Sequence, residues 1–172
     1  MTVKSVVKRT DKTPLGTLLS ILTSFEVMAR YLELKLQRHQ VSLIRFNIMS
    51  ALAKRGGEMT PSEIAEAVFR EKNTITAAIN SLEKEGLVHR EPSINDRRSV
   101  KVMITEKGWD EVNHLSPIAQ ELSQEALSCL DKNNIEDLVE IMRSLRASLL
   151  PKVTKASADG KRSNNEVSQR NR

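Results

Sequence analysis

The stretch NTITAAINSLEKEGLVHREPSINDRRSVKVMIT, residues 73–105, decides the fold. In its first half, apolar residues recur every three or four positions from Ile75 to Leu82, which predicts a helix with one buried face that ends at Gly86. Its second half reads as two strands, LVHRE and SVKVMIT, around a connection rich in turn residues. A helix followed directly by a β-hairpin is therefore expected.

The segment before it, MTPSEIAEAVF, predicts a second short helix. Thr60 suits the N-cap, Pro61 the first helical position, and Glu63 closes a capping box. A polar break, REKN, separates the two helices, so together they predict a helix-turn-helix. With the hairpin behind it, the arrangement is a winged helix, and the hairpin loop is its wing.

Helical patterns also flank this region. Apolar residues spaced by three and four from Leu15 to Leu36 predict a long helix, and VSLIRFNIMSAL a further helix that begins at Ser42 and ends at the Gly56–Gly57 pair. After the hairpin, a helix capped by Thr105 with a kink at Pro117 and a last helix capped by Asp131 are expected. Apolar residues lie on more than one side of these outer helices, which favours dimerisation because a monomer of this size cannot bury them all.

The charge of the chain is concentrated at its ends. Of the formal net charge of +5, residues 1–12 carry +3 and residues 152–172 carry +4, which leaves −2 for the body between them. The total is therefore weak evidence for a nucleic-acid partner. Within the body, however, residues 70–101 hold seven basic and five acidic side chains, whereas residues 106–150 are acidic, so one end could face an anion.

The second helix of the helix-turn-helix has the side chains that reading DNA requires. Such a helix enters the major groove, where hydroxyls and amides can bond base edges or phosphates and methyl groups can touch thymine. An ordinary polar helix face would look similar. The outward positions, predicted to bind DNA, are Asn73, Thr74, Thr76, Ala77, Asn80, Ser81 and Lys84.

The wing carries Asp96, Arg97 and Arg98 at its tip. Arginines on a ribbon beside a recognition helix can reach the adjacent minor groove. A carboxylate near phosphate is unfavourable unless it is paired, so Asp96 is expected to brace one of the two arginines. Without the preceding helices, a solvated turn would be the better interpretation.

Taken together, these motifs resemble the MarR family of bacterial transcription regulators over about residues 15–150, most specifically in the Asp96–Arg98 wing and the VMITEKG segment after it. The resemblance implies a homodimer that reads a pseudo-palindromic operator in double-stranded DNA and releases it when a small molecule binds, often an aromatic or phenolic acid or its CoA thioester. It also implies that Arg98 enters the minor groove and that Asp96 braces it. The sequence departs from the family at Ala77, where many members carry arginine, and at Phe69, where many carry glycine.

The domain organisation expected from these patterns has five parts. They are a flexible basic arm (1–14), an N-terminal dimerisation helix (15–40), a winged helix-turn-helix DNA-binding domain (41–105), C-terminal dimerisation helices (106–150) and a disordered basic tail (151–172). The fold class is mainly α with a small β-hairpin.

The sequence gives little support for a metal site, a cofactor site or a catalytic site. The three histidines and the single Cys129 lack metal-ligand spacing, and no catalytic constellation indicates an enzyme, so neither a metal nor a cofactor is expected. Cys129 is interpreted as a buried structural thiol rather than a redox switch. The absence of a membrane segment and of a disulfide pair indicates a cytoplasmic protein. The candidate effector-binding residues are Tyr31, Arg38, His39, Arg45 and Trp109.

The function expected from the sequence is a ligand-responsive repressor that binds its operator as a homodimer. The alternative is a winged-helix module that holds a protein partner and makes only nonspecific DNA contacts.

Overall fold

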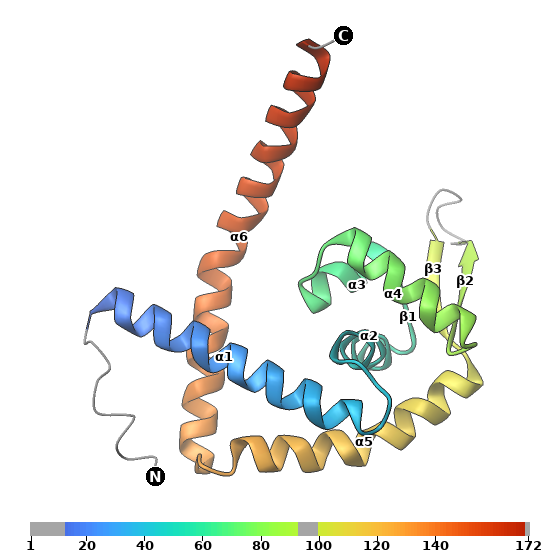
Figure 1. Cartoon of the computed structure of the whole chain (residues 1–172), viewed down its shortest axis with the longest axis vertical. Coiled ribbons are helices and arrows are strands. Elements are labelled where there is room, and N and C mark those ends of the chain that lie inside the picture. The colour runs from blue at the N-terminus through green and yellow to red at the C-terminus, as the bar shows by residue number, and fades with distance from the viewer. Residues whose placement is uncertain (1–12, 93–99, 171–172) are drawn as a thin grey trace. The chain divides into compact units, whose positions relative to one another are not determined.

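The computed structural model describes residues 13–92 and 100–170, with side chains as far as residue 154. The elements follow in the order α1 (Pro14–Gln37), α2 (Leu43–Lys54), β1 (Glu58–Met59), α3 (Pro61–Val68), α4 (Lys72–Lys84), β2 (Val88–Pro92), β3 (Val100–Ile104), α5 (Glu106–Leu127) and α6 (Lys132–Arg170) (Figure 1). They divide into two units, one that ends at Gln124 and one that begins at Glu125. The predicted fold class, mainly helical with a small winged-helix hairpin, is confirmed.

The predicted helix starts are confirmed by hydrogen bonds. The Thr60 hydroxyl accepts from the backbone N–H of Glu63 at 3.2 Å, and the Glu63 carboxylate accepts from the backbone N–H of Thr60 at 2.7 Å, which completes the capping box of α3. Ser42, Thr105 and Asp131 accept from the backbone N–H three residues on, at 3.4, 3.0 and 2.8 Å. Each cap satisfies an N–H that the first turn leaves unpaired.

The turn between α3 and α4 has left-handed backbone geometry. Phe69, which ends α3, has a φ of 51°, and the N–H of Arg70 bonds the carbonyl of Ala65 at 3.0 Å. Glycine adopts this conformation without cost, whereas another residue costs about 1–2 kcal/mol. The backbone at position 69 therefore has a conformation that favours glycine, although the residue there is an exposed phenylalanine.

The hairpin belongs to a three-stranded antiparallel sheet in the order β1-β3-β2 within the described residues. Val88 pairs with Ile104 and Pro92 with Val100 in the hairpin, as the two predicted strands require. The additional strand β1 pairs Met59 with Val102. Two residues are too few to show an alternating pattern, so sequence analysis missed this strand.

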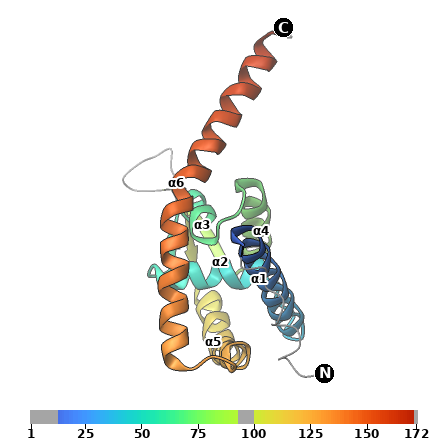
Figure 2. The ribbon, with the colours of Figure 1, turned by 90° about the vertical axis from the view of Figure 1, so that its left-hand side faces the viewer.

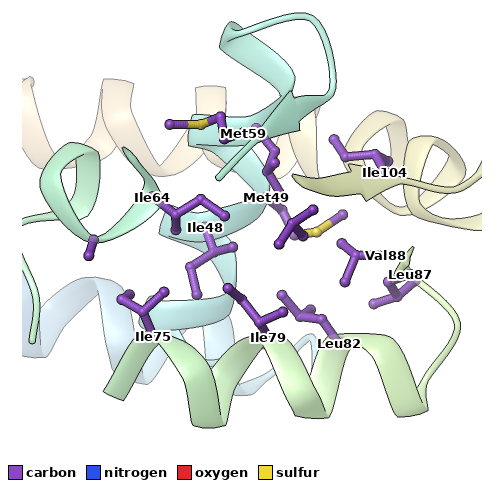
Figure 3. Packing of buried hydrophobic residues seen from close by; sticks show 13 residues of the cluster. Ile48, Met49, Met59, Ile64, Ile75, Ile79, Leu82, Leu87, Val88 and Ile104 are labelled. Carbon is purple, nitrogen blue, oxygen red and sulfur yellow. The ribbon is translucent and has the colours of Figure 1, made fainter. Parts of the chain in front are cut away.

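The core lies where α2, α3 and α4 meet the sheet. In Figure 3, Ile75, Ile79 and Leu82 project from one side of α4 toward Ile48 of α2 and Ile64 of α3. All five side chains are 0% exposed. The predicted buried face of α4 is confirmed, and its opposite face is left to solvent.

Gly108 allows α5 to begin close against the hairpin. A Cβ atom on this residue would lie 2.0 Å from the carbonyl oxygen of Leu87 and 2.7 Å from a methyl carbon of Ile104. The same Leu87 carbonyl accepts from the N–H of Thr105 at 3.1 Å. Any side chain at position 108 would therefore push α5 away from the sheet.

Helix α1 exposes most of its apolar surface. Only its C-terminal end is buried, through Leu36, which is 1% exposed. The N-terminal part leaves a stripe of large apolar side chains 47–64% exposed: Leu15, Leu18, Leu19, Leu22 and Phe25. We call these five residues the α1 stripe.

Helix α6 corrects the prediction of a disordered tail from residue 151, because it continues without interruption from Lys132 to Arg170. Pro151 lies inside the helix, where it removes one hydrogen bond and favours a bend. Figure 2 shows that the axis of α6 changes direction between its two halves. The tail was predicted to be disordered because its polar side chains cannot form a buried core. Its lysine, alanine, arginine and glutamate residues nevertheless have good helix propensity.

Cys129 is exposed, so its prediction as a buried thiol was wrong. The prediction extended the helical period of Leu122 and Ala126 to position 129. Helix α5 ends at Leu127, and Cys129 lies in the turn before α6, where that period no longer applies.

Candidate nucleic-acid interface

The outward face of α4 is the candidate recognition surface. All seven residues predicted to bind DNA in this helix are exposed: Asn73, Thr74, Thr76, Ala77, Asn80, Ser81 and Lys84. The structure thus brings together on one helix face the side chains that the sequence selected. Whether they bind DNA stays a prediction.

The N-terminal half of α4 offers donors and methyl groups. The hydroxyl of Thr76 donates to the carbonyl of Lys72 at 2.8 Å, so its proton is occupied. Thr76 and its neighbour Ala77, which both carry a methyl group, are exposed. Among the described residues, the N-cap Glu71 makes no side-chain capping bond, so the first N–H groups of α4 stay available. Such a helix start can receive a phosphate, and the methyl groups can contact thymine.

The C-terminal half of α4 is tied to the rest of the unit. Glu85 accepts from Nη2 of Arg45 on α2 at 2.6 Å and from the hydroxyl of Ser81 at 3.1 Å. The backbone carbonyl of Glu85 accepts from Nζ of Lys107 on α5 at 2.8 Å, and that of Gly86 from the hydroxyl of Thr105 at 2.7 Å. These contacts fix the direction in which α4 points relative to α2 and α5.

The hairpin strand β2 contacts the same half of α4. Arg90 donates through Nη2 to Oδ1 of Asn80 at 2.6 Å and through Nη1 to the carboxylate of Glu83. Sequence analysis missed Arg90, because its role depends on pairing a strand with a helix ten residues earlier. The hairpin and α4 are thereby held as one surface, which Figure 1 shows as β2 beside α4.

The residues predicted at the wing tip, Asp96, Arg97 and Arg98, lie outside the described residues. Strand β2 ends at Pro92 and strand β3 begins at Val100, and these two residues are paired with each other. A cross-strand ion pair at 2.5 Å joins Lys101 of β3 to Glu58 of β1 and braces the other edge.

The five candidate effector residues come from α1, the turn after it, α2 and α5. Nζ of Lys35 lies 5.2 Å from the ring centroid of Tyr31, Arg38 and His39 are exposed at the end of α1, and Arg45 pairs with Glu85. Trp109 packs over Gly57, where an added Cβ would lie 2.9 Å from its ring. Whether these residues bind an effector stays a prediction.

A groove of about 770 Å³ lies between α2, α3 and α5. Its lining is mostly apolar or small, with Lys54 and Arg55 as its cations and hydroxyl and amide groups from α2 and α5. None of the five predicted effector residues lines it. The lining consists of Phe46, Asn47, Met49, Ser50, Ala51, Ala53, Lys54, Arg55, Ala67, Val68, Val112, Leu115, Ser116, Ala119, Gln120 and Ser123.

The charge state of Glu63 reflects its place in the capping box. Its pKa is lowered chiefly because the backbone N–H of Thr60 donates to the carboxylate, with the Thr60 side chain as the next cause. The surrounding positive charges of Arg55 and Lys101 act in the same direction. The capping box explains the lowered pKa of Glu63, so this pKa does not indicate acid–base catalysis.

Two other kinds of site find no support in the part of the chain that the structure describes. No group of three or more histidine, cysteine, aspartate or glutamate side chains is arranged to hold a metal ion. No described helix is long and apolar enough to cross a membrane.

The segment that contains α4 and strand β2 is similar to a known protein family. Residues 39–99, which span α2 to the hairpin, match the MarR family model. The resemblance predicted from the sequence is confirmed.

One curated relative and two solved structures are similar over longer ranges. PecS, an HTH-type transcriptional regulator from Dickeya dadantii, is 31% identical over 88 residues, which cover 50% of this chain and 53% of PecS. This chain thus spans about half the length of that relative.

Sco3205, a MarR family transcriptional regulator from Streptomyces coelicolor whose structure is in complex with DNA, has a TM-score of 0.71 at 23% identity, and the match covers 80% of this chain and 92% of Sco3205. BpsR from Bordetella bronchiseptica, whose DNA binding is described as regulated by 6-hydroxynicotinic acid, has a TM-score of 0.67 at 20% identity, with 77% and 98% covered. At these identities the two structures support the MarR winged-helix fold.

Proposed function

We propose that this protein is a sequence-specific DNA-binding transcription regulator that represses by occupying its operator as a homodimer. The observation that carries the proposal is the exposed polar and methyl face of α4, held by Arg90 against the strand that leads to the arginine wing. The family of residues 39–99 and the DNA complex of a protein with the same fold support it. The protein is not proposed to be an enzyme, and it would act in the cytoplasm, where its operator lies.

The homodimer is proposed because the α1 stripe is exposed in a single chain. A second copy that covers it would bring two α4 helices onto one DNA duplex, so that the second contact becomes intramolecular. Two recognition helices related by a two-fold axis require half-sites about one helical turn apart. The operator should therefore be a pseudo-palindrome.

Selection from a genomic DNA-fragment library at near-physiological salt tests this proposal. The wild type should enrich one pseudo-palindrome. Ala77→Glu, which places a carboxylate on the outward face of α4, and Arg98→Ala should each lose that enrichment. Asn113→Glu, an exposed site on α5, is the matched control and should keep it. Sequence-blind binding by the wild type would overturn the proposal and favour the protein-interaction module.

We also propose that the groove between α2, α3 and α5 receives the effector. Its apolar lining suits an aromatic ring, and Lys54 and Arg55 suit a carboxylate or the phosphates of a CoA thioester. Helices α2 and α5 both hold Glu85 at the end of α4, so a ligand that shifts either helix would redirect the recognition helix. DNA and ligand must then weaken each other's binding to the same extent.

The effector proposal can be tested on the protein–operator complex. Addition of 6-hydroxynicotinic acid or simple aromatic carboxylates should release the DNA, and Ala119→Phe, which fills the groove, should abolish the release while DNA affinity is kept. Retention of the response in Ala119→Phe would place the effector elsewhere.

A further inference from the structure

The guanidinium of Arg90 determines which end of the Asn80 side chain faces outward. Arg90 carries only hydrogen-bond donors, so the Asn80 atom that it contacts at 2.6 Å must be the carbonyl oxygen, Oδ1. The amide nitrogen, Nδ2, is then the end left to solvent on the exposed face of α4.

The second contact of Arg90 keeps this orientation in place. Its Nη1 donates to the Glu83 carboxylate, one turn along α4 from Asn80, and the side chain of Arg90 is 29% exposed. The two contacts use different nitrogens of one planar group, so the guanidinium cannot rotate without breaking one of them. Glu83 also neutralises Arg90, which reduces the tendency of this arginine to turn away toward a phosphate.

The orientation restricts the bases that Asn80 can read. An unconstrained asparagine reads adenine with two bonds, since its oxygen accepts from N6 and its nitrogen donates to N7. When the oxygen is held by Arg90, the nitrogen offers only donors. Guanine presents two adjacent acceptors in the major groove, N7 and O6, whereas adenine presents one, N7, beside the N6 donor, and thymine presents one, O4. The two N–H groups of the amide therefore suit guanine best.

We propose that Asn80 is a specificity-determining residue that selects guanine on the strand it contacts, at one base-pair position of each half-site, and that Arg90 is its positioning residue. This inference rests on the proposed DNA-binding function and goes beyond it by assigning the atom that reads the base. It predicts that the preference at this one position depends on a residue of the hairpin that itself touches no base.

Two variants separate the reading atom from its support. Asn80→Asp keeps an oxygen toward Arg90 and replaces the donor by an acceptor of the same shape, so binding to the guanine-containing operator should fall roughly ten- to hundredfold. The double variant Glu83→Gln/Arg90→Met frees the amide oxygen and removes both charges of the ion pair, so adenine, which can then take two bonds, should replace guanine as the preferred base at that position. Glu91→Gln, which removes an exposed carboxylate of the same strand that pairs with His89, is the matched control and should keep the wild-type preference.

The measurement is selection of operators randomised at every position, with thermal unfolding of each variant as a check on folding. A change of preference at one symmetry-related position, in Asn80→Asp and in the double variant, is the expected result. An equal loss on all sequences would show that Asn80 contacts the DNA backbone and would overturn the inference, as would an unchanged preference. A wild type that enriches no sequence would overturn the proposed function and this inference together.

Discussion

The winged helix and helix α1 are both rich in leucine and isoleucine, but only the winged helix finishes its packing within one chain. Ile48, Ile64 and Ile79 are 0% exposed, whereas Leu15 and Leu19 of the α1 stripe are 64% and 54% exposed. A soluble monomer rarely leaves such an apolar stripe uncovered. The same residue type therefore forms a closed core in one region and an exposed stripe in the other, and we propose that this stripe is an interface.

The largest effect is expected where α5 meets the winged helix. Gly108→Ala places a methyl group 2.0 Å from the Leu87 carbonyl oxygen, so the free energy of unfolding should fall by about 3 kcal/mol. Gly56→Ala is the matched control, because its Cβ would meet open space and only its positive φ of 79° opposes the change; about 1 kcal/mol is expected there. Urea unfolding measures both, and equal losses would show that the contact with Leu87 does not set the requirement for glycine.

A smaller effect on stability, but a direct effect on assembly, is expected in the α1 stripe. Leu19→Asp places a charge on the exposed face, so the dimer dissociation constant should rise by roughly tenfold or more, while the unfolding of the winged-helix core changes little. Ser20→Asp, one residue along the same helix, should leave association unchanged. Sedimentation equilibrium distinguishes them, and a wild-type monomer at micromolar concentration would contradict the interpretation of the stripe as an interface.

The smallest effect concerns the start of α3. Because the folded state lowers the pKa of Glu63, its carboxylate contributes stability above the unfolded pKa of about 4.3, and this contribution is lost as the pH falls through the lower folded value. Glu63→Gln should therefore lower stability by about 0.5 kcal/mol at pH 7 and by less at acid pH. Urea unfolding of the wild type and of Glu63→Gln from pH 7 to 3 measures the difference between their stabilities. A difference that grows toward low pH would contradict the role of the charge.

Local sequence patterns were sufficient to predict much of the winged helix. A cap such as Thr60 acts on an N–H three residues away, and the buried face of α4 follows from the helical period alone, so both could be predicted. The same period misled the interpretation of Cys129, because where α5 ends cannot be read from the spacing of Leu122 and Ala126.

By itself the sequence determined the helix caps, the core face of α4, the hairpin and the family of residues 39–99, because each of these depends on neighbours in the chain or on a motif of fixed spacing. Only the tertiary structure decided that a groove lies between α2, α3 and α5. It likewise decided that Leu87 requires Gly108 and that Arg90 orients Asn80. These features depend on distances between residues that are remote in sequence, and no local propensity encodes such distances.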